Sequence, residues 1–137
     1  MSDKALRLMM GGLALVTLGI AAYLVQAHYS GTPVVCSTGG CDAVEQSRYS
    51  DVFGIPVALI GLLGSAAILM TLVRGDLLAR AAGLALASSG LVFAVYLVVV
   101  QLAVLHAVCE WCIANDSLLA VIAALAAVRA RAGRTVI

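Results

Sequence analysis

Four long apolar stretches dominate the chain, and short polar segments separate them. They cover residues 8–27, 53–73, 77–105 and 109–128. Each is close to or above the roughly 20 residues that an α-helix needs to cross the hydrocarbon core of a bilayer. The pattern therefore predicts an all-α integral membrane protein, in which residues 1–137 form one domain built as a bundle of four transmembrane helices.

The one substantial polar stretch, residues 28–52, is expected to be an extracytoplasmic loop. Within it, Asp42 and Glu45 have the spacing of a capping box, which predicts a short helix from Asp42 to Tyr49. Cys41 would lie at the entrance of that helix. A thiol there faces the positive end of the helix dipole, which favours the thiolate.

The first apolar stretch has a second interpretation, a cleaved signal peptide. It follows Lys4 and Arg7, and Val25-Gln26-Ala27 has the small residues of a cleavage site. The apolar run is longer than the ~7–15 residues of a signal core, so a transmembrane helix is the favoured interpretation.

Composition and charge support a lipid environment and give the orientation. Hydrophobic residues make up 64% and charged residues 11% of the chain, whereas soluble domains average about 25% charged residues. A net charge of +1 is too small an excess of positive charge to indicate binding of nucleic acid. Four spans place seven cationic residues on the side of the termini and only Arg48 on the other; the seven are Lys4, Arg7, Arg74, Arg80, Arg129, Arg131 and Arg134. The positive-inside rule then predicts a multi-pass protein of the plasma or inner membrane with both termini in the cytoplasm.

The four cysteines form two pairs, which this topology places at the outer face of the membrane. Cys109 and Cys112 form a C-x-x-C at the start of the fourth span, and Cys36 and Cys41 lie in the polar loop, separated in part by the flexible Gly39-Gly40. Disulfides persist on that side, and a thiolate on one pair can attack a disulfide in the other. We therefore expect all four to be catalytic and to pass electrons from a soluble thiol protein to a membrane quinone, with the deeper Cys112 meeting the quinone.

Two other functions remain open for the same cysteines. The spacings C-x4-C and C-x2-C could together form a four-thiolate zinc site. The chain could also be a non-catalytic assembly subunit whose loops are held by static disulfides. We favour electron transfer, with no resident metal.

Asp116 lies four residues after Cys112, on the same face of the fourth helix. An ionisable residue at that depth in the membrane is a functional candidate, either to bind a quinone oxygen or to handle the proton that quinone reduction requires. The alternative is that Asn115 and Asp116 line a wet crevice, or that Asp116 pairs with Arg48.

Aromatic and histidine residues gather near the predicted outer interface. An aromatic belt accounts for the aromatic ones, and the histidines are interface residues or proton relays. They are Trp111, Tyr23, Tyr29, Tyr49, His28 and His106.

An ordered set of motifs resembles the bacterial branch of the vitamin K epoxide reductase family. The set comprises the loop cysteine pair, Ser47-Arg48-Tyr49, Phe53-Gly54-Ile55-Pro56 at the start of the second span, and the C-x-x-C at the start of the fourth. The resemblance covers nearly the whole chain. It implies a quinone-dependent thiol oxidoreductase that regenerates disulfides in a thioredoxin-fold (DsbA-like) extracytoplasmic partner.

The resemblance also implies a role for each cysteine. Cys36 would meet the protein partner, Cys41 would exchange with Cys109, and Cys112 would face the quinone. Ser47 matches a serine of the family's loop helix that holds the cover of the site. The expected quinone-binding residues are Cys112, Asp116, Trp111 and Ser47.

Two departures from the family pattern refine the expectation. Vertebrate members have a tyrosine where this chain has Asp116, which favours reduction of a plain quinone (menaquinone, ubiquinone or a vitamin K-like quinone) over epoxide reduction. Many bacterial members continue into a thioredoxin-like domain. This chain stops at Ile137, so we expect the partner to be a separate protein.

Overall fold

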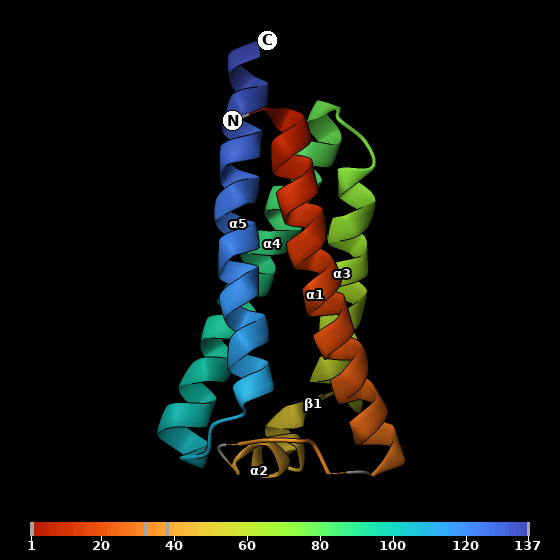
Figure 1. Ribbon diagram of the computed structural model, residues 1–137. Coiled ribbons are helices and arrows are strands. Elements are labelled where there is room, and N and C mark those ends of the chain that lie inside the picture. The colour runs from red at the N-terminus through yellow and green to blue at the C-terminus, as the bar shows by residue number, and fades with distance from the viewer. Residues whose placement is uncertain (1, 32, 38, 137) are drawn as a thin grey trace.

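The computed structural model describes residues 2–31, 33–37 and 39–136. Its long helices run side by side, with both termini near one end of the bundle and a small loop region at the other (Figure 1). These helices are α1 (Asp3–Ser30), α3 (Val57–Leu72), α4 (Leu77–Val99) and α5 (Glu110–Val136). The predicted all-α bundle is confirmed.

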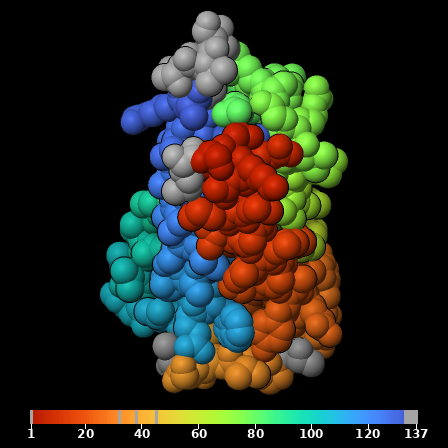
Figure 2. All heavy atoms as spheres, turned by 45° about the horizontal axis from the view of Figure 1, so that its top comes forward, coloured from red at the N-terminus to blue at the C-terminus, as the bar shows by residue number. Residues whose placement is uncertain are grey.

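Each long helix packs mainly against two of the other long helices. α1 packs against α3 and α5, and α4 packs against the same two helices from the other side. Figure 2 shows the packing of α1 from outside the bundle, with α1 lying between α5 and α3. Chain neighbours α3 and α4 are joined by a short turn, whereas the contact between α1 and α5 closes the bundle.

Among the described residues, three helical segments are long and apolar enough to cross a membrane: Asp3–Ser30, Leu77–Leu105 and Glu110–Ala132. The last part of the second of these is a π-helix, η2 (Val100–Leu105), which follows α4 without a break. The helical residues 77–105 therefore match the expected third span. The fourth helix begins at Glu110, one residue later than expected, and α1 extends beyond both expected ends.

The second span differs most from its expected range. Helix α3 has 16 residues, or a length of about 24 Å at 1.5 Å per residue. The first residues of the expected span instead form a hairpin of two short strands, β1 (Asp51–Val52) and β2 (Ile55–Pro56). Phe53 and Gly54 make the turn, and both have positive φ, 52° and 81°, as a two-residue hairpin turn of this kind requires. The helix can start only after this turn.

The loop helix is shorter than expected. Helix α2 (Cys41–Glu45) is followed by a 3-10 turn, η1 (Arg48–Ser50), so the expected helix from Asp42 to Tyr49 is wrong in extent. The N-cap is Gly40, and the Asp42 carboxylate instead accepts a hydrogen bond from the backbone N–H of Val34 at 3.1 Å. The capping-box spacing was misleading because the Asp42 side chain binds the backbone of the preceding loop and does not cap the helix. The expectation that Cys41 opens the helix is confirmed.

Many of the buried apolar side chains among the described residues fall into two clusters. The larger one joins all four long helices: Met10, Ala14, Ile68, Leu72, Ala87, Ile122, Ala123 and Ala126. The smaller one lies where the loop meets the bundle and consists of Leu24, Ala27, Val34, Cys41 and Cys109. Many large apolar side chains on the outside of the bundle, among them Leu63, Val92 and Val121, are exposed, as expected for a surface that faces lipid.

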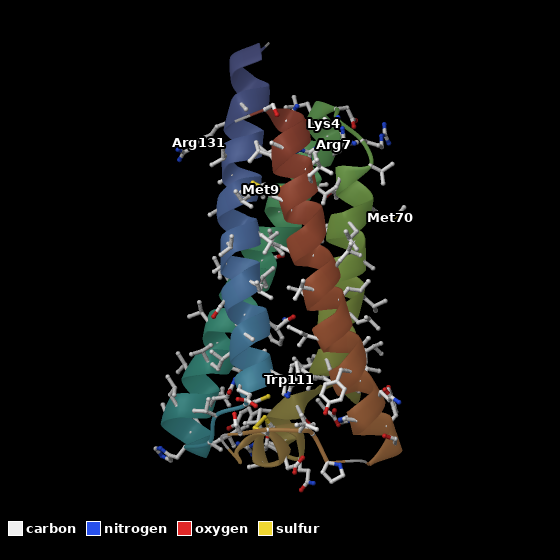
Figure 3. The ribbon with its side chains drawn as sticks, in the orientation of Figure 1. Lys4, Arg7, Met9, Met70, Trp111 and Arg131 are labelled. Atoms are coloured by element: carbon white, nitrogen blue, oxygen red, sulfur yellow. A yellow bond between two sulfur atoms is a disulfide. The ribbon has the colours of Figure 1, made fainter. Side chains whose placement is uncertain are left out.

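Charged residues gather at the end of the bundle that carries the termini, where Figure 3 shows Lys4, Arg7 and Arg131. Asp3 lies at the centre of an ion-pair network. Its carboxylate is 3.9 Å from the Arg7 guanidinium, 3.2 Å from Arg80 and 3.1 Å from Arg129. Arg129 is 1% exposed and also donates a hydrogen bond to the Arg74 carbonyl at 2.7 Å. This network ties α1, α4 and α5 to the turn between α3 and α4.

Candidate functional site

The structure brings the four cysteines to one end of the bundle. Cys41 and Cys109 are both fully buried in the smaller cluster, and Cys36 and Cys112 pack against it. Cys36 and Cys41 form a disulfide with their Cα atoms 6.0 Å apart. The expected neighbourhood of the two cysteine pairs is therefore present in the fold.

Cys109 occupies the position just before α5 and caps the helix. Its carbonyl accepts a hydrogen bond from Ile113 N at 3.0 Å, and its Sγ accepts one from Cys112 N at 3.2 Å. This is the place where a serine or aspartate side chain usually accepts a hydrogen bond at a helix N-terminus. A sulfur so placed gains stabilisation as a thiolate from the N–H group and from the helix dipole.

Gln101, which we did not predict to have a role, holds Cys109 from the other side. It lies in η2, is 2% exposed, and its Oε1 accepts a hydrogen bond from Cys109 N at 2.9 Å. The sequence does carry a signal, since Gln101 is the one amide in the apolar run from residue 91 to residue 105. A buried amide in such a run needs a hydrogen-bond partner, and here the partner is the backbone N–H of Cys109.

Gly40 allows the loop to touch the segment before the C-x-x-C. A Cβ atom at Gly40 would lie 2.5 Å from the Val108 carbonyl oxygen and 2.8 Å from Val108 N. Only glycine permits this approach, so the backbone next to Cys41 lies against the backbone next to Cys109. The sequence pattern suggested that Gly39-Gly40 makes the loop flexible, whereas at Gly40 the structure uses the missing side chain for close contact.

Cys112 opens onto a cavity of about 360 Å³ between the helices. Its lining is mostly apolar and comes from α1, α3, α4 and α5, with η1 and α2 as a cover. The volume lies within the range of ligand pockets in proteins. Cys109 is not part of the lining, which fits the expectation that Cys112 is the deeper thiol.

Asn115 and Asp116 also line this cavity. The Oδ1 atom of Asn115 and the Oδ2 atom of Asp116 are buried and have no hydrogen-bond partner among the described residues. Buried polar atoms are normally hydrogen-bonded, so these two are suited to a ligand that brings its own donors. The alternative pairing of Asp116 with Arg48 is not formed: the Arg48 guanidinium donates to the Tyr49 hydroxyl at 3.0 Å and lies over the Tyr49 ring. That hydrogen bond raises the pKa of Arg48 above its ordinary value.

Ser47 lines the cavity from the cover. Its hydroxyl donates to the Val44 carbonyl at 2.7 Å, and its own carbonyl accepts from Ser50 N at 3.1 Å and from Ser50 Oγ at 2.8 Å. Ser47 thus joins α2 to η1 within the cover of the cavity. The role that the resemblance implies for it stays a prediction. Tyr49 in η1 lines the cavity too, although the sequence had suggested only an interface role for it.

Trp111 does not line the cavity within the described structure. Its indole Nε1–H donates to the Val35 carbonyl, and its ring packs against the Tyr23 ring with centroids 5.2 Å apart. Figure 3 shows Trp111 at the loop end of the bundle. The structure therefore does not bring Trp111 to the expected quinone pocket and gives it a contact with the loop instead.

The histidines lie at the edge of this region. His28 Nε2 is 3.5 Å from the Asp51 carboxylate, and His106 ends η2 with a positive φ of 51°. Over residues 2–31, 33–37 and 39–136, no group of three or more His, Cys, Asp or Glu side chains could hold a metal ion.

The chain matches a known protein family. Residues 8–127 match the model described as the vitamin K epoxide reductase family. The match covers α3, α4, the loop, both cysteine pairs and most of α1 and α5.

Proposed function

Because the chain belongs to the vitamin K epoxide reductase family, we propose that it carries electrons from an extracytoplasmic thioredoxin-fold dithiol protein to a quinone in the membrane. Membership makes the chain a membrane thiol oxidoreductase linked to quinone. One observation supports a path for the electrons through the four cysteines: Cys41 and Cys109 share one buried cluster, and Cys112 faces a cavity.

The proposed path begins at the loop. A thiolate of the partner attacks Cys36 of the Cys36–Cys41 disulfide, forms a mixed disulfide and releases Cys41 as a thiolate. The second thiol of the partner then attacks that mixed disulfide, which leaves the partner oxidised and Cys36 reduced. A thiol in such exchange needs only to reach the disulfide that it attacks.

Cys41 next attacks Cys109 of an oxidised C-x-x-C, which forms a Cys41–Cys109 bond and releases the Cys112 thiolate. Cys36 resolves this bond, so the loop disulfide forms again and the C-x-x-C is left as a dithiol. Two electrons and two protons then pass from Cys109 and Cys112 to the quinone, giving a quinol and the Cys109–Cys112 disulfide. Each bond broken is matched by one formed.

The cavity fits a quinone ring as the electron acceptor. Its apolar walls suit a molecule that enters from lipid, and its lining includes the polar side chains of Asn115 and Asp116, which lie in the same helix as Cys112. Asp116 is placed one helical turn beyond that thiol, so we assign to it a hydrogen bond to a quinone oxygen and delivery of a proton during reduction. Plain quinones of the menaquinone, ubiquinone or vitamin K type all present such oxygens.

The proposed orientation puts the termini in the cytoplasm and the cysteine loop outside. The bundle places both termini at one end and α2 at the other (Figure 1), and the cationic residues follow the same division. The positive-inside rule then assigns the arginine-rich end to the cytoplasm of a plasma or inner membrane.

The activity is tested by following quinone absorbance when detergent-solubilised protein meets a reduced thioredoxin-fold substrate. We expect quinone loss that is stoichiometric with new disulfides in the substrate. Absence of quinone reduction with every thioredoxin-fold and small dithiol donor would contradict the proposal.

A metal-binding protein that uses the four thiols is the second candidate. The loop disulfide engages two of those four sulfurs, which favours redox exchange. Metal analysis of purified protein separates the candidates, because stoichiometric zinc with all four cysteines reduced would support the metal site.

A further inference from the structure

The two residues between the cysteines of the C-x-x-C hold the two residues on either side of Cys36. Glu110 binds Ser37, and Trp111 binds Val35. The loop disulfide is therefore attached, before and after Cys36, to the same first turn of α5 that carries Cys112.

The contact on the Ser37 side is a paired one. The Glu110 carboxylate accepts from Ser37 N at 2.8 Å through Oε1 and from the Ser37 hydroxyl through Oε2. Hydrogen bonds to a charged group are about twice as strong as those between neutral groups. Glu110 thereby fixes both the backbone and the side chain of the residue that follows Cys36.

On the other side of Cys36, the contacts hold the backbone N–H and carbonyl groups of Val35. Trp111 Nε1–H donates to the Val35 carbonyl, and the Tyr23 hydroxyl accepts from Val35 N at 2.9 Å. The Trp111 and Tyr23 rings pack against each other, so α1 and α5 hold the segment together. The Val35 side chain takes no part and is 74% exposed.

We propose that Glu110 and Trp111 are positioning residues that hold the loop in register over the C-x-x-C, so that Cys41 reaches Cys109. This inference rests on the electron path proposed above. Gly40 against Val108 fixes the other end of the same short loop. With both ends held, the internal exchange runs at a high effective concentration of one thiol at the other.

The step that depends on the positioning is the attack of the Cys41 thiolate on Cys109. The bond Cys41–Cys109 forms, the bond Cys109–Cys112 breaks, and Cys112 leaves as a thiolate. Attack on Cys36 by an outside reductant does not need the loop to be aligned with the C-x-x-C. We call the contacts of Glu110 with Ser37 and of Trp111 with Val35 the clamp. Loss of the clamp therefore slows the attack of Cys41 on Cys109, the internal step. It leaves reduction of the loop disulfide by an outside thiol, the external step, as fast or faster.

The test uses Trp111→Phe, which keeps an aromatic ring and removes the indole donor, and Glu110→Ala, which removes the carboxylate. In quinone-free protein, a limiting amount of a small dithiol reduces the loop disulfide. Acid quenching, alkylation and mass spectrometry then follow the electrons from Cys36 and Cys41 to Cys109 and Cys112. The matched control is Val35→Ala, because both backbone contacts of Val35 survive it.

We expect Glu110→Ala and Trp111→Phe each to slow electron transfer from the loop to the C-x-x-C about ten-fold. This is the size of effect that loss of one hydrogen bond suggests. The rate at which the dithiol reduces the loop disulfide should stay the same. Glu110→Gln retains an acceptor and should recover part of the rate; Val35→Ala should match the parent protein. If a variant is poorly folded, Ser37→Ala removes one hydroxyl bond only and should slow internal transfer by a smaller factor.

Two results would overturn the positioning role: unchanged internal transfer in all the clamp variants, or equal slowing of the external and internal steps. Failure of the electron path itself looks different. In that case the parent protein shows no transfer from the loop to the C-x-x-C at all.

Discussion

At the scale of single residues, Asp116 has a buried carboxylate oxygen with no partner among the described residues, in the cavity that Cys112 faces. In the proposed role of proton donor to quinone, Asp116 should contribute about 10²-fold or more to the rate, which is typical of general acid catalysis. Asp116→Asn keeps the size of the side chain and removes the acid. We expect quinone reduction to fall by that factor, measured by quinone absorbance with dithiothreitol as donor.

Ser117→Ala is the control for this prediction. The Ser117 side chain is exposed, bonds the Ile113 carbonyl of its own helix and does not line the cavity. It should have the parent rate. Equal rates in Asp116→Asn and the parent protein would remove Asp116 from the mechanism.

The cysteines should separate into two roles. Cys112→Ala removes the thiol that faces the cavity, so we expect it to abolish quinone reduction with any donor. Cys36→Ala leaves Cys112 and the cavity unchanged, so it should chiefly impair oxidation of the protein partner while a small dithiol still supports quinone reduction. Steady-state quinone assays with the two donors measure both effects, and full quinone turnover in Cys112→Ala would refute the assignment.

At the scale of elements, the approach of the loop to α5 depends on Gly40. A methyl group at this position would meet the Val108 backbone at 2.5 Å, and a backbone contact of this kind cannot be relieved by rotating a side chain. We expect Gly40→Ala to move the loop away from Cys109, to cost about 1–3 kcal/mol of stability and to slow internal disulfide exchange at least ten-fold. Alkylation kinetics and thermal unfolding in detergent measure the two effects.

Gly19→Ala is the matched control, since a Cβ atom there meets nothing within 4 Å. It should keep the exchange rate and gain up to about 1 kcal/mol from helix propensity. If both glycine variants exchange at the parent rate, the close approach at Gly40 is not needed for the reaction.

The long apolar runs were sufficient to predict the helices, because a membrane requires spans of known length. They were insufficient at residues 53–56, where apolar residues form a hairpin because Phe53 and Gly54 adopt positive φ. The candidate site could be predicted where chemistry marks a residue, as with the cysteines, which the structure brings to one end of the bundle, and Asp116, which lines the cavity. It was not predictable where a role depends on which backbone lies opposite, as with Gly40 and the contact of Trp111 with Val35. The lone amide of Gln101 was visible in the sequence, but its partner, the backbone N–H of Cys109, was not.

At the scale of the whole molecule, the ion-pair network around Asp3 closes the bundle at the end that carries the termini. Arg129 is almost fully buried there, and removing one member of a buried ion pair typically costs about 3–5 kcal/mol. We expect Arg129→Ala to lower the thermal unfolding temperature in detergent markedly. Arg131→Ala, in the same helix but exposed, should change stability by less than about 0.5 kcal/mol. Equal unfolding temperatures for the two variants would contradict the structural role of Arg129.

The two ends of the bundle thus have different tasks. The network around Asp3 holds the helices together, and the opposite end carries both cysteine pairs and the cover of the cavity. The central claim is that the loop pair and the C-x-x-C meet directly through Cys41 and Cys109, which share one buried cluster.

The most direct test is to trap that meeting. In a Cys36→Ala, Cys112→Ala double variant, the two remaining cysteines can bond only to each other within one molecule. After mild oxidation in membranes, peptide mapping by mass spectrometry should find the Cys41–Cys109 disulfide as the dominant species. If both thiols instead stay reduced, or bond only between separate molecules, the two pairs do not meet and the electron path is contradicted.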